Sequence, residues 1–445
     1  MKQGGTTESL CPVCLAELEA KVIENRDEIY IEKECPQHGR FKTRHAWQDP
    51  FLYRNFAKLS SIRKDTFTDC TLDVTPRCNM ECPFCFGVEN FEEPGLEEIS
   101  NKASGREQGM ALLYGGEPTL RDDIADITRT IKERGLGVNL VTNGLNLDEE
   151  LVCELEKAGL DRVQMQFDSI DDDINRKLRG KSFTSEKLRA INNLNETKIN
   201  LTFFTVVFKE NLGEIVKIVS LMAQYVRNPT TTILSPVSPE TNSSDFQVNH
   251  VGNGEIFERL KEEFGIDKED FVECTKFDIF LSNFLSKFGI NRRSPAPCEA
   301  LVYIYRGRGR VEKITNLLDI EKLTEVLKGA SEKESKGNAL LSVFRGILSE
   351  NIVKRYEIIP EVFLSATRFF ARTFLGGEDG RNPMKDFFGI IVNPSQDRYN
   401  YDKRFIDNCN LESDFNGEYI SFCERNIRKA RGIKKDNLNK DKILE

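Results

Sequence analysis

The sequence is poor in histidine and tryptophan and has no long apolar run. Only three of the 445 residues are His and one is Trp, so histidine-based acid–base or metal chemistry has few candidates. A membrane-spanning helix needs about 20 consecutive apolar residues, and no such stretch occurs. The first residues also lack the apolar core of a signal peptide. We therefore expect no transmembrane segment and a cytoplasmic protein, with at most a peripheral contact to a membrane.

The charge balance is acidic. The 63 Lys and Arg against 72 Asp and Glu give a formal net charge of −9, which argues against a general nucleic-acid-binding protein. With 39% hydrophobic and 30% charged residues the composition is globular, and the length predicts two or three domains. We predict a metal-binding ribbon in residues 1–60, an α/β domain in 61–240 and an α+β region with a basic tail in 241–445.

Cysteine, in contrast, is abundant, with twelve residues. In a reducing cytoplasm a disulfide framework is not expected, and most of the cysteines form groups with the spacing of metal ligands. The groups are Cys11, Cys14 and Cys35; Cys78, Cys82 and Cys85; and Cys298, Cys409 and Cys423, whereas Cys70, Cys153 and Cys274 are more isolated.

The most informative group lies in the run Cys78-Asn79-Met80-Glu81-Cys82-Pro83-Phe84-Cys85. Thiolates select zinc, copper(I) or iron–sulfur clusters, and a four-iron cluster or a structural zinc normally takes four cysteines. If these three bind one cluster, one iron keeps an open position, which is typical of a catalytic site. The alternative is an electron-transfer cluster or zinc site whose fourth ligand is a distant cysteine.

Two knuckles near the amino terminus form another group. Cys11-Pro12-Val13-Cys14 and Cys35-Pro36-Gln37-His38 flank a strand-like segment, a pattern typical of a ribbon around one tetrahedral ion. We predict that Cys11, Cys14, Cys35 and His38 bind a structural zinc or a single iron, a redox iron being the alternative. The metal would supply folding energy, since so short a segment has little core.

Between residues 68 and 240, strand-like and helical segments alternate. This alternation predicts βα units on a parallel sheet, arranged as a doubly wound sheet or as an open, partial (β/α)6 barrel. In both, ligands bind at the carboxyl ends of the strands. The predicted strands are Cys70–Thr75, Met110–Tyr114, Gly137–Val141, Arg162–Phe167, Asn200–Val207 and Thr231–Leu234, and the predicted helices are Arg121–Glu133, Asp148–Ala158, Thr184–Leu194 and Asn211–Tyr225.

Unusual residues follow these strands on what should be one rim. The cysteine run follows the first strand, Gly115-Gly116-Glu117-Pro118 the second and Thr142-Asn143-Gly144 the third. Asp168 follows the fourth strand and Ser235-Pro236 the sixth. Because the carboxyl ends of parallel strands lie at one edge, this placement favours an active site that includes the three cysteines.

The remaining residues give weaker signals. Glu361–Leu375 has a Phe-rich apolar face, which indicates helical core or the lining of a site for an apolar substrate. Phe387–Val392 has the pattern of a buried strand. The basic end from Arg425 to Lys442 is predicted to be solvated and frayed, with contact to anionic lipid or substrate as the alternative. Helical patterns occur at Ile256–Glu263, Phe271–Lys287, Ile320–Lys328 and Ala339–Leu348.

Taken together, these motifs give the chain a resemblance to the radical S-adenosylmethionine (SAM) superfamily. The resemblance rests on the C-x3-C-x2-C run with Phe84 before its last cysteine and on Gly115-Gly116-Glu117-Pro118. It implies a partial barrel and a [4Fe–4S] cluster, held by Cys78, Cys82 and Cys85, whose open iron chelates SAM. Reductive cleavage of SAM would give a 5′-deoxyadenosyl radical, while the protein orients the cofactor and excludes water. The backbone near Phe84 would contact the adenine.

The resemblance also assigns the rim residues to SAM. Gly115 and Gly116 would let the chain approach the methionine moiety, and Glu117 would accept hydrogen bonds from its ammonium group. Asn143 and Asp168 would lie near the methionine or the ribose. For Glu117 the alternative is a carboxylate that stabilises a helix amino terminus.

Further motifs narrow the resemblance to the branch that contains archaeal tetraether lipid synthase and the pterin-methylating enzymes of methanogens. They include the two amino-terminal knuckles, Gln166-Phe167-Asp168 and Arg179-Gly180, and they cover roughly residues 8–240. The branch carries auxiliary iron–sulfur clusters in its carboxyl-terminal part, and we expect one here. Its candidate ligands are Cys298, Cys409 and Cys423, with Cys274 as a fourth candidate.

The resemblance implies an enzyme that abstracts hydrogen from an unactivated C–H bond and uses a low-potential electron donor. The substrate would be a lipid chain, joined carbon to carbon, or a pterin-like heterocycle, which is methylated; the Phe-rich late region favours an apolar one. A peptide-modifying maturase is a second enzymatic alternative. The non-enzymatic alternative is an iron–sulfur or zinc protein that carries electrons or regulates a partner, and it would need neither SAM nor Glu117.

Overall fold

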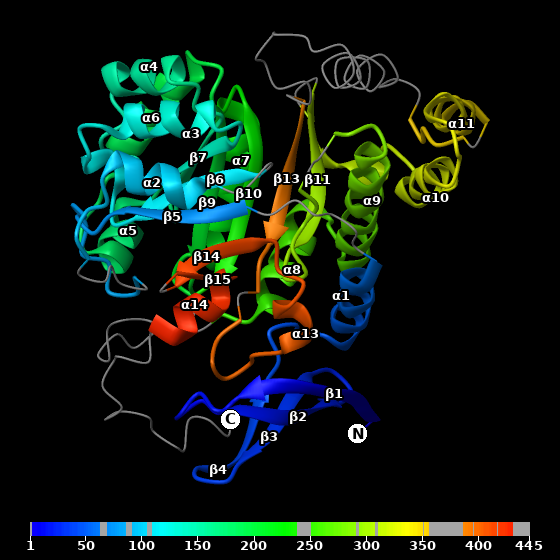
Figure 1. Ribbon diagram of the computed structural model, residues 1–445. Helices are drawn as coiled ribbons and strands as arrows, with labels where there is room; N and C mark the ends of the chain where they lie inside the picture. Colours follow the sequence, from blue (N-terminus) through cyan, green and yellow to red (C-terminus); the bar gives the residue numbers. More distant parts are fainter. Residues whose placement is uncertain are drawn as a thin grey trace.

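The computed structural model describes residues 2–62, 69–85, 91–104, 109–237, 251–290, 293–307, 310–349, 351–355, 386–394, 396–415 and 417–429. In this part of the chain the strands form a four-stranded antiparallel sheet and an eleven-stranded mixed sheet (Figure 1). The predicted Phe-rich face of 361–375 and the basic tail beyond Lys429 lie outside the described residues.

The small sheet is the amino-terminal ribbon. Its strands pair in chain order, and the two predicted knuckles lie at the turn after the first strand and at the turn between the last two. A helix, α1 (Pro50–Ile62), leads from the ribbon to the large sheet. The strands are β1 (Lys2–Leu10), β2 (Glu17–Glu24), β3 (Ile29–Cys35) and β4 (Gly39–Arg44).

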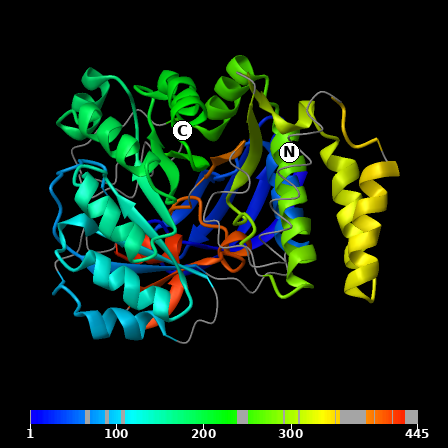
Figure 2. The same ribbon diagram turned by 90° about the horizontal axis from the view of Figure 1, so that it is seen from above.

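The six predicted strands all form, and they lie side by side in parallel and in chain order. A doubly wound sheet would reverse its strand order at a switch point. The unreversed order therefore confirms the partial barrel, in which right-handed crossovers place the helices on the outer side (Figure 2). The strands are β5 (Asp69–Thr75), β6 (Met110–Gly115), β7 (Gly137–Thr142), β8 (Arg162–Gln166), β9 (Asn200–Val207) and β10 (Pro229–Pro236).

The outer helices include two that the sequence did not indicate, α2 and α5. Only Asn175 and Leu178 of α5 are buried, so no apolar stripe marks this helix. It is defined by its ends instead, because the Asp171 side chain caps its first N–H groups and Gly180 closes it at φ 79°. The helices are α2 (Leu96–Ala103), α3 (Ile124–Glu133), α4 (Glu149–Lys157), α5 (Asp172–Arg179), α6 (Thr184–Asn195) and α7 (Ile215–Tyr225), with short 3₁₀ helices η1 (Pro118–Leu120) and η2 (Leu212–Glu214).

Strands from the carboxyl-terminal region extend the barrel sheet on both sides. β13 (Phe387–Val392), fully buried as predicted, pairs in parallel with β10. Beyond β13 the sheet is extended by β11 (Ala300–Gly307), which pairs antiparallel with β13, and by β12 (Arg310–Lys313), which pairs antiparallel with β11. At the other edge β14 (Leu411–Phe415) pairs in parallel with β5, followed by β15 (Glu418–Ser421). The sheet therefore continues across the predicted boundary at residue 240.

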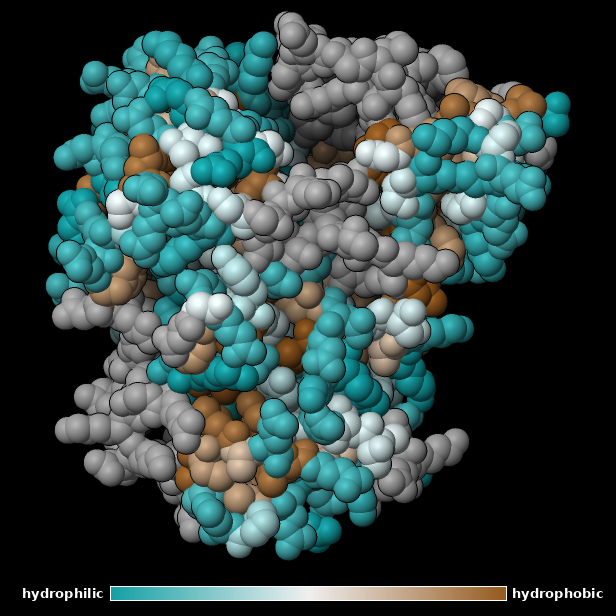
Figure 3. Space-filling model, viewed as in Figure 1, coloured by the Kyte–Doolittle hydropathy of each residue, from teal (hydrophilic) through white to brown (hydrophobic). Residues whose placement is uncertain are grey.

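The remaining helices cover β11 and β13 and the space beyond them. The long helix α9 packs against β11, and α10 and α11 lie outside α9 (Figure 1). Leu341 and Phe344 of α11 are exposed. The face of the molecule in Figure 3 is mostly hydrophilic, with several smaller apolar patches. Within the described residues, no helix combines the length and apolarity needed to cross a membrane. The helices are α8 (Asn253–Phe264), α9 (Lys268–Ser286), η3 (Ile314–Asn316), α10 (Ile320–Ser331), α11 (Lys336–Ser349), α13 (Lys403–Ile406) and α14 (Phe422–Lys429).

The start of the basic end differs from its prediction. Arg425 was expected in a solvated, frayed tail, but it lies in α14, is 3% exposed and forms an ion pair with Asp73 of β5. Lys429 pairs with the same carboxylate at 3.5 Å. The composition of the tail could not indicate this contact, because Asp73 lies more than 300 residues earlier in the chain.

Candidate active site

The cysteine run forms the loop that leaves β5 at the carboxyl edge of the barrel. Cys78 and Cys85 are exposed, Cys82 is partly buried and Phe84 is buried. Although the residue is exposed, partial desolvation of the sulfur by the surrounding chain raises the pKa of the Cys78 thiol, and the charges of Glu117, Cys82 and Cys85 raise it further. The three thiols belong to one eight-residue loop, and the hydrogen bond from the Glu117 N–H to Arg77 O places Glu117 beside that loop. Three thiolates at this spacing are the ligand set that one cluster can take.

Two glycines let the next loop approach the cysteine loop closely. The N–H of Gly116 donates to Thr75 O at 2.7 Å, and the N–H of Glu117 donates to Arg77 O at 2.7 Å. A Cβ atom on Gly116 would lie 2.0 Å from Arg77 O, and Gly115 has φ +128°. The glycines are thus needed for a backbone contact that joins the ends of β5 and β6.

Glu117 is buried at the centre of this edge and joins its own loop to the loop after β7. Its Oε1 accepts hydrogen bonds from the Thr119 N–H (3.1 Å), the Thr119 hydroxyl (2.6 Å) and the Thr142 hydroxyl (2.6 Å). Its Oε2 accepts one, from the Asn143 N–H at 2.7 Å. Burial raises the pKa of Glu117, while these donors oppose that shift. Oε2 retains acceptor capacity for one more donor.

Asn143 lies between Glu117 and the cysteine loop. Its backbone N–H binds Glu117, and its side-chain amide donates to Asn79 Oδ1 at 2.7 Å. Asn79 is the residue after Cys78. The loop after β7 therefore connects Glu117 to the cysteine loop, as the order of the strands predicts.

Asp168 is linked to a cysteine through an arginine that sequence analysis did not propose for the site. Arg179, from the last turn of α5, donates to Asp168 Oδ2 at 2.7 Å and to the Cys82 thiol at 3.1 Å. Its guanidinium also lies over the Phe84 ring, 4.2 Å from the centroid. The sequence resemblance already included Arg179-Gly180 as a motif, but it gave no indication that Arg179 contacts Cys82.

Lys187 is a second residue that the prediction missed. It is 4% exposed, and its Nζ donates to the Gln166 backbone oxygen at 3.0 Å and side-chain oxygen at 2.5 Å. Burial lowers its pKa to about 8, against the charge of Asp168. The sequence could have indicated this residue, because Lys187 lies on the same face of its helix as the apolar residues Ala190 and Ile191.

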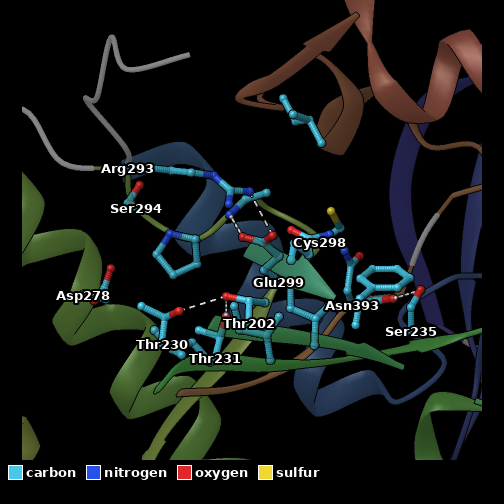
Figure 4. A pocket seen from close by; sticks show the side chains of 18 of the residues that line it. Thr202, Thr230, Thr231, Ser235, Asp278, Arg293, Ser294, Cys298, Glu299 and Asn393 are labelled. Atoms are coloured by element: carbon cyan, nitrogen blue, oxygen red, sulfur yellow. Dashed lines mark hydrogen bonds and ion pairs between the residues drawn. The ribbon is translucent and has the colours of Figure 1, made fainter. Parts of the chain in front are cut away.

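A cavity of about 940 Å³ extends from the cysteine loop across the inner face of the sheet. On β6 to β9 alternate residues line it, such as Gln164 and Gln166 of β8, whereas Val163 and Met165 face the outer helices with no exposed surface. Its polar part includes an ion pair of Arg293 with Glu299 at 2.9 Å (Figure 4). Its apolar arm is lined by α9, α10 and α11 through Phe277, Leu281, Leu323, Leu327, Val343 and Ile347.

The late cysteines separate into three that converge and one that does not. Cys298, Cys409 and Cys423 line the same cavity, and after burial the charges of the other two raise the pKa of Cys298. Cys298 lies more than 100 residues before the other two, whereas Cys409 and Cys423 are close together in the sequence. Cys274 has no exposed surface, lies in the core on α9 and does not line the cavity.

The four predicted ribbon ligands converge. The ligand atoms of Cys11, Cys14, Cys35 and His38 all lie within 4.8 Å of one another. Cys14 Sγ is 3.9 Å from Cys35 Sγ, and His38 Nδ1 is 3.4 Å from Cys35 Sγ. A tetrahedron with Zn–S bonds of about 2.3 Å has edges near 3.8 Å, so the residues fit one tetrahedral metal ion.

Two family models match the chain. The model of the radical SAM superfamily matches residues 72–222, and the model described as the HMPTM N-terminal zinc ribbon domain matches residues 4–46. The first match covers five of the six barrel strands, β5 to β9, and most of α7, together with the three rim loops, and the second covers the ribbon with its four ligands.

Similar proteins include a curated relative over most of the chain. The 7,8-dihydro-6-hydroxymethylpterin dimethyltransferase of Methanocaldococcus jannaschii is 30% identical over 378 residues, 74% of this chain and 74% of the relative. The PqqA peptide cyclase of Granulibacter bethesdensis is 30% identical over 150 residues, 32% of this chain and 40% of that protein. The crystal structure of Streptococcus suis SuiB bound to precursor peptide SuiA gives a TM-score of 0.38 at 18% identity, over 47% of this chain and 48% of that one, a likeness too low to support an argument.

Proposed function

The chain belongs to the radical SAM superfamily, by its match over residues 72–222 and its 30% identity to the dimethyltransferase over 74% of its length. From this premise we propose that this radical SAM enzyme activates an unactivated C–H bond of a largely apolar substrate, for C–C bond formation or C-methylation. The observation that carries the substrate class is the apolar arm of the cavity, which extends from the barrel to α9, α10 and α11.

Three cysteines hold the cofactor in this proposal. Cys78, Cys82 and Cys85 offer three thiolates from one eight-residue loop, which fits a [4Fe–4S] cluster with one iron open to SAM. When bound, the cluster and SAM supply the one-electron chemistry that activates the C–H bond. The protein contributes the position of the substrate, the electrostatics around the cofactor and the exclusion of water.

Glu117 would bind the ammonium group of SAM. Its Oε2 has one protein donor and capacity for another, whereas Oε1 already accepts three hydrogen bonds. Burial raises the pKa of Glu117, and a cationic ligand would favour the ionised carboxylate that binds it. Gly115, Gly116 and Asn143 hold this carboxylate beside the cysteine loop, and the backbone near Phe84 would contact the adenine.

Arg179 would tune the cluster through Cys82. A cationic hydrogen-bond donor 3.1 Å from a thiolate stabilises added negative charge and so favours the reduced cluster. We expect Arg179→Met to lower the reduction potential of the cluster by on the order of 50 mV, close to the 59 mV of a tenfold change in a one-electron equilibrium. A spectroscopically monitored redox titration measures it. The control is Arg129→Met, which replaces an exposed arginine of α3. A reduction potential in Arg179→Met equal to that of wild type would contradict the proposed effect of Arg179 on the cluster.

The late cysteines would bind one auxiliary iron–sulfur cluster. Cys298, Cys409 and Cys423 line the cavity that also reaches Cys85, so both proposed clusters would border one space. The ribbon ligands would bind zinc, in agreement with the zinc ribbon match over residues 4–46. Iron, sulfide and zinc per chain after anaerobic reconstitution test these assignments together.

The substrate class is tested by supplying candidates separately. Reduced enzyme with SAM receives an isoprenoid glycerol ether lipid or 7,8-dihydro-6-hydroxymethylpterin, and products are measured by mass spectrometry. We expect the lipid to increase 5′-deoxyadenosine and to be modified at a C–H position. Modification of the pterin alone would favour the second candidate, pterin C-methylation, for which the similarity to the dimethyltransferase is the specific observation.

A single substitution tests the apolar arm. Leu323→Trp places an indole where α10 borders the cavity, so we expect modification of the lipid to fall at least about tenfold because a buried anchor worth about 1.5–3 kcal/mol loses its space. Cleavage of SAM without substrate should persist. Leu188→Trp, on exposed α6 surface, is the matched control. Equal lipid modification by both variants would exclude the arm from substrate binding.

A further inference from the structure

The amino-terminal ribbon is bound to one short segment of the carboxyl-terminal region, residues 398–403. The hydroxyls of Thr43 and Ser9 donate to the backbone oxygens of Tyr399 and Tyr401, each at 2.6 Å. Lys33 Nζ donates to the Tyr399 oxygen at 2.8 Å. Ser9 and Lys33 are at most 2% exposed, so these bonds form in an interface from which water is excluded.

Lys33 makes this contact specific. Its ammonium group has three hydrogens, and it donates to Ser9 Oγ (3.0 Å), to Tyr399 O (2.8 Å) and to Arg398 O (3.3 Å). A buried ammonium is strongly destabilising unless its donors are satisfied. Two of the three acceptors belong to residues 398 and 399, so the buried position of Lys33 depends on that segment being in place.

Asp402, in the carboxyl-terminal segment, also binds the ribbon, in this case as an acceptor. It has no exposed surface, and its carboxylate accepts from the Thr7 hydroxyl at 2.6 Å and from His45 Nε2 at 3.3 Å. His45 Nδ1 accepts from the Trp47 N–H, which leaves Nε2 as the donor. The Asp402 carboxylate also caps α13 by accepting from the Arg404 N–H at 3.1 Å.

Short connections lead from this segment to two of the late cysteines. The N–H of Cys409 donates to Ile406 O at 3.0 Å, at the end of the helix that Asp402 caps. Gln396 accepts from the Asp402 N–H at 2.8 Å through its side chain, and it lines the cavity together with Cys409 and Cys423. Leu10, the residue before the ribbon ligand Cys11, packs in one apolar cluster with Tyr401, Ile406 and Ile427 beside Cys423.

We propose that the ribbon is the positioning element of the auxiliary site. Through Lys33 and Asp402 it holds the segment that orients Cys409 and Cys423, so metal binding in the ribbon is required before the late cysteines can bind iron. The inference rests on the proposed auxiliary cluster. The ribbon ligands and the late cysteines thereby form one assembly unit, although they are separated by most of the chain.

Two variants test it in the full-length chain. Lys33→Met removes the buried donor, and Cys14→Ser removes one ribbon ligand. Lys21→Met, an exposed lysine on β2, is the matched control. After anaerobic reconstitution, iron, sulfide and zinc per chain are measured, together with electron paramagnetic resonance of the reduced protein with and without SAM, and hydrogen exchange of residues 396–409.

Wild type and Lys21→Met should carry about eight irons per chain, as two [4Fe–4S] clusters require. Lys33→Met and Cys14→Ser should lose about half of this iron and the signal that is insensitive to SAM, keep the SAM-sensitive signal, and exchange faster in residues 396–409. Two clusters in both variants with unchanged exchange would overturn the positioning role alone. About four irons in wild type would instead overturn the auxiliary cluster, and this inference with it.

Discussion

Replacing Cys82 with alanine is expected to abolish SAM cleavage, with 5′-deoxyadenosine at the level of the protein-free control. The chain offers three thiolates in this loop, and a cluster that already leaves one iron without a protein ligand cannot lose a second ligand and stay intact. Cys82 is also the thiol that Arg179 contacts at 3.1 Å. Iron content, the electron paramagnetic resonance signal and nucleoside release measured on the same sample separate loss of the cluster from loss of chemistry.

The matched control is Cys153→Ala, because Cys153 is an exposed cysteine on α4, outside the cavity lining. It should retain the iron content and the nucleoside yield of wild type. Nucleoside formation by Cys82→Ala at the wild-type rate would show that the C-x3-C-x2-C loop does not hold the reactive cluster.

Glu117→Gln is expected to weaken SAM binding by roughly 10- to 100-fold. A charge-assisted hydrogen bond is worth about 1.5–3 kcal/mol, and the amide would lose the charge that balances the SAM ammonium. The substitution also turns an N–H group toward donors, because Glu117 accepts from the N–H groups of Thr119 and Asn143. Equilibrium dialysis with labelled SAM gives the dissociation constant of the reconstituted variant.

The control for this substitution is Glu154→Gln, an exposed carboxylate on α4. Both variants should keep the iron of the cluster, since neither changes a thiolate. Wild-type affinity for SAM in Glu117→Gln would mean that the carboxylate acts only within the protein, as the anchor of the loops after β6 and β7.

Much of the barrel could be predicted because its signals are local. The strands of a parallel sheet are buried on both faces and read as short apolar runs, and residues such as Val74, Leu113 and Leu140 have at most 2% exposure. The rim motifs follow directly from these strands. Helix α5 was missed because its capping by Asp171 and Gly180, rather than an apolar stripe, defines it.

The contacts that complete the site could not be predicted in the same way, because they join residues distant in sequence. Arg179 reaches Cys82 across 97 positions, and β14 pairs with β5 across more than 300. The close approach of Gly116 to Arg77 is a further example: the motif suggested room for a ligand, whereas the geometry shows a backbone contact. Long-range pairing depends on the whole fold, which short-range patterns do not encode.

The most direct test of the account is whether the reconstituted, dithionite-reduced protein converts SAM to 5′-deoxyadenosine and methionine. The account predicts that both products form in equal amounts and only when the cluster in the Cys78, Cys82 and Cys85 loop is intact and reduced. Absence of 5′-deoxyadenosine from a sample whose spectroscopy shows that reduced cluster would contradict it.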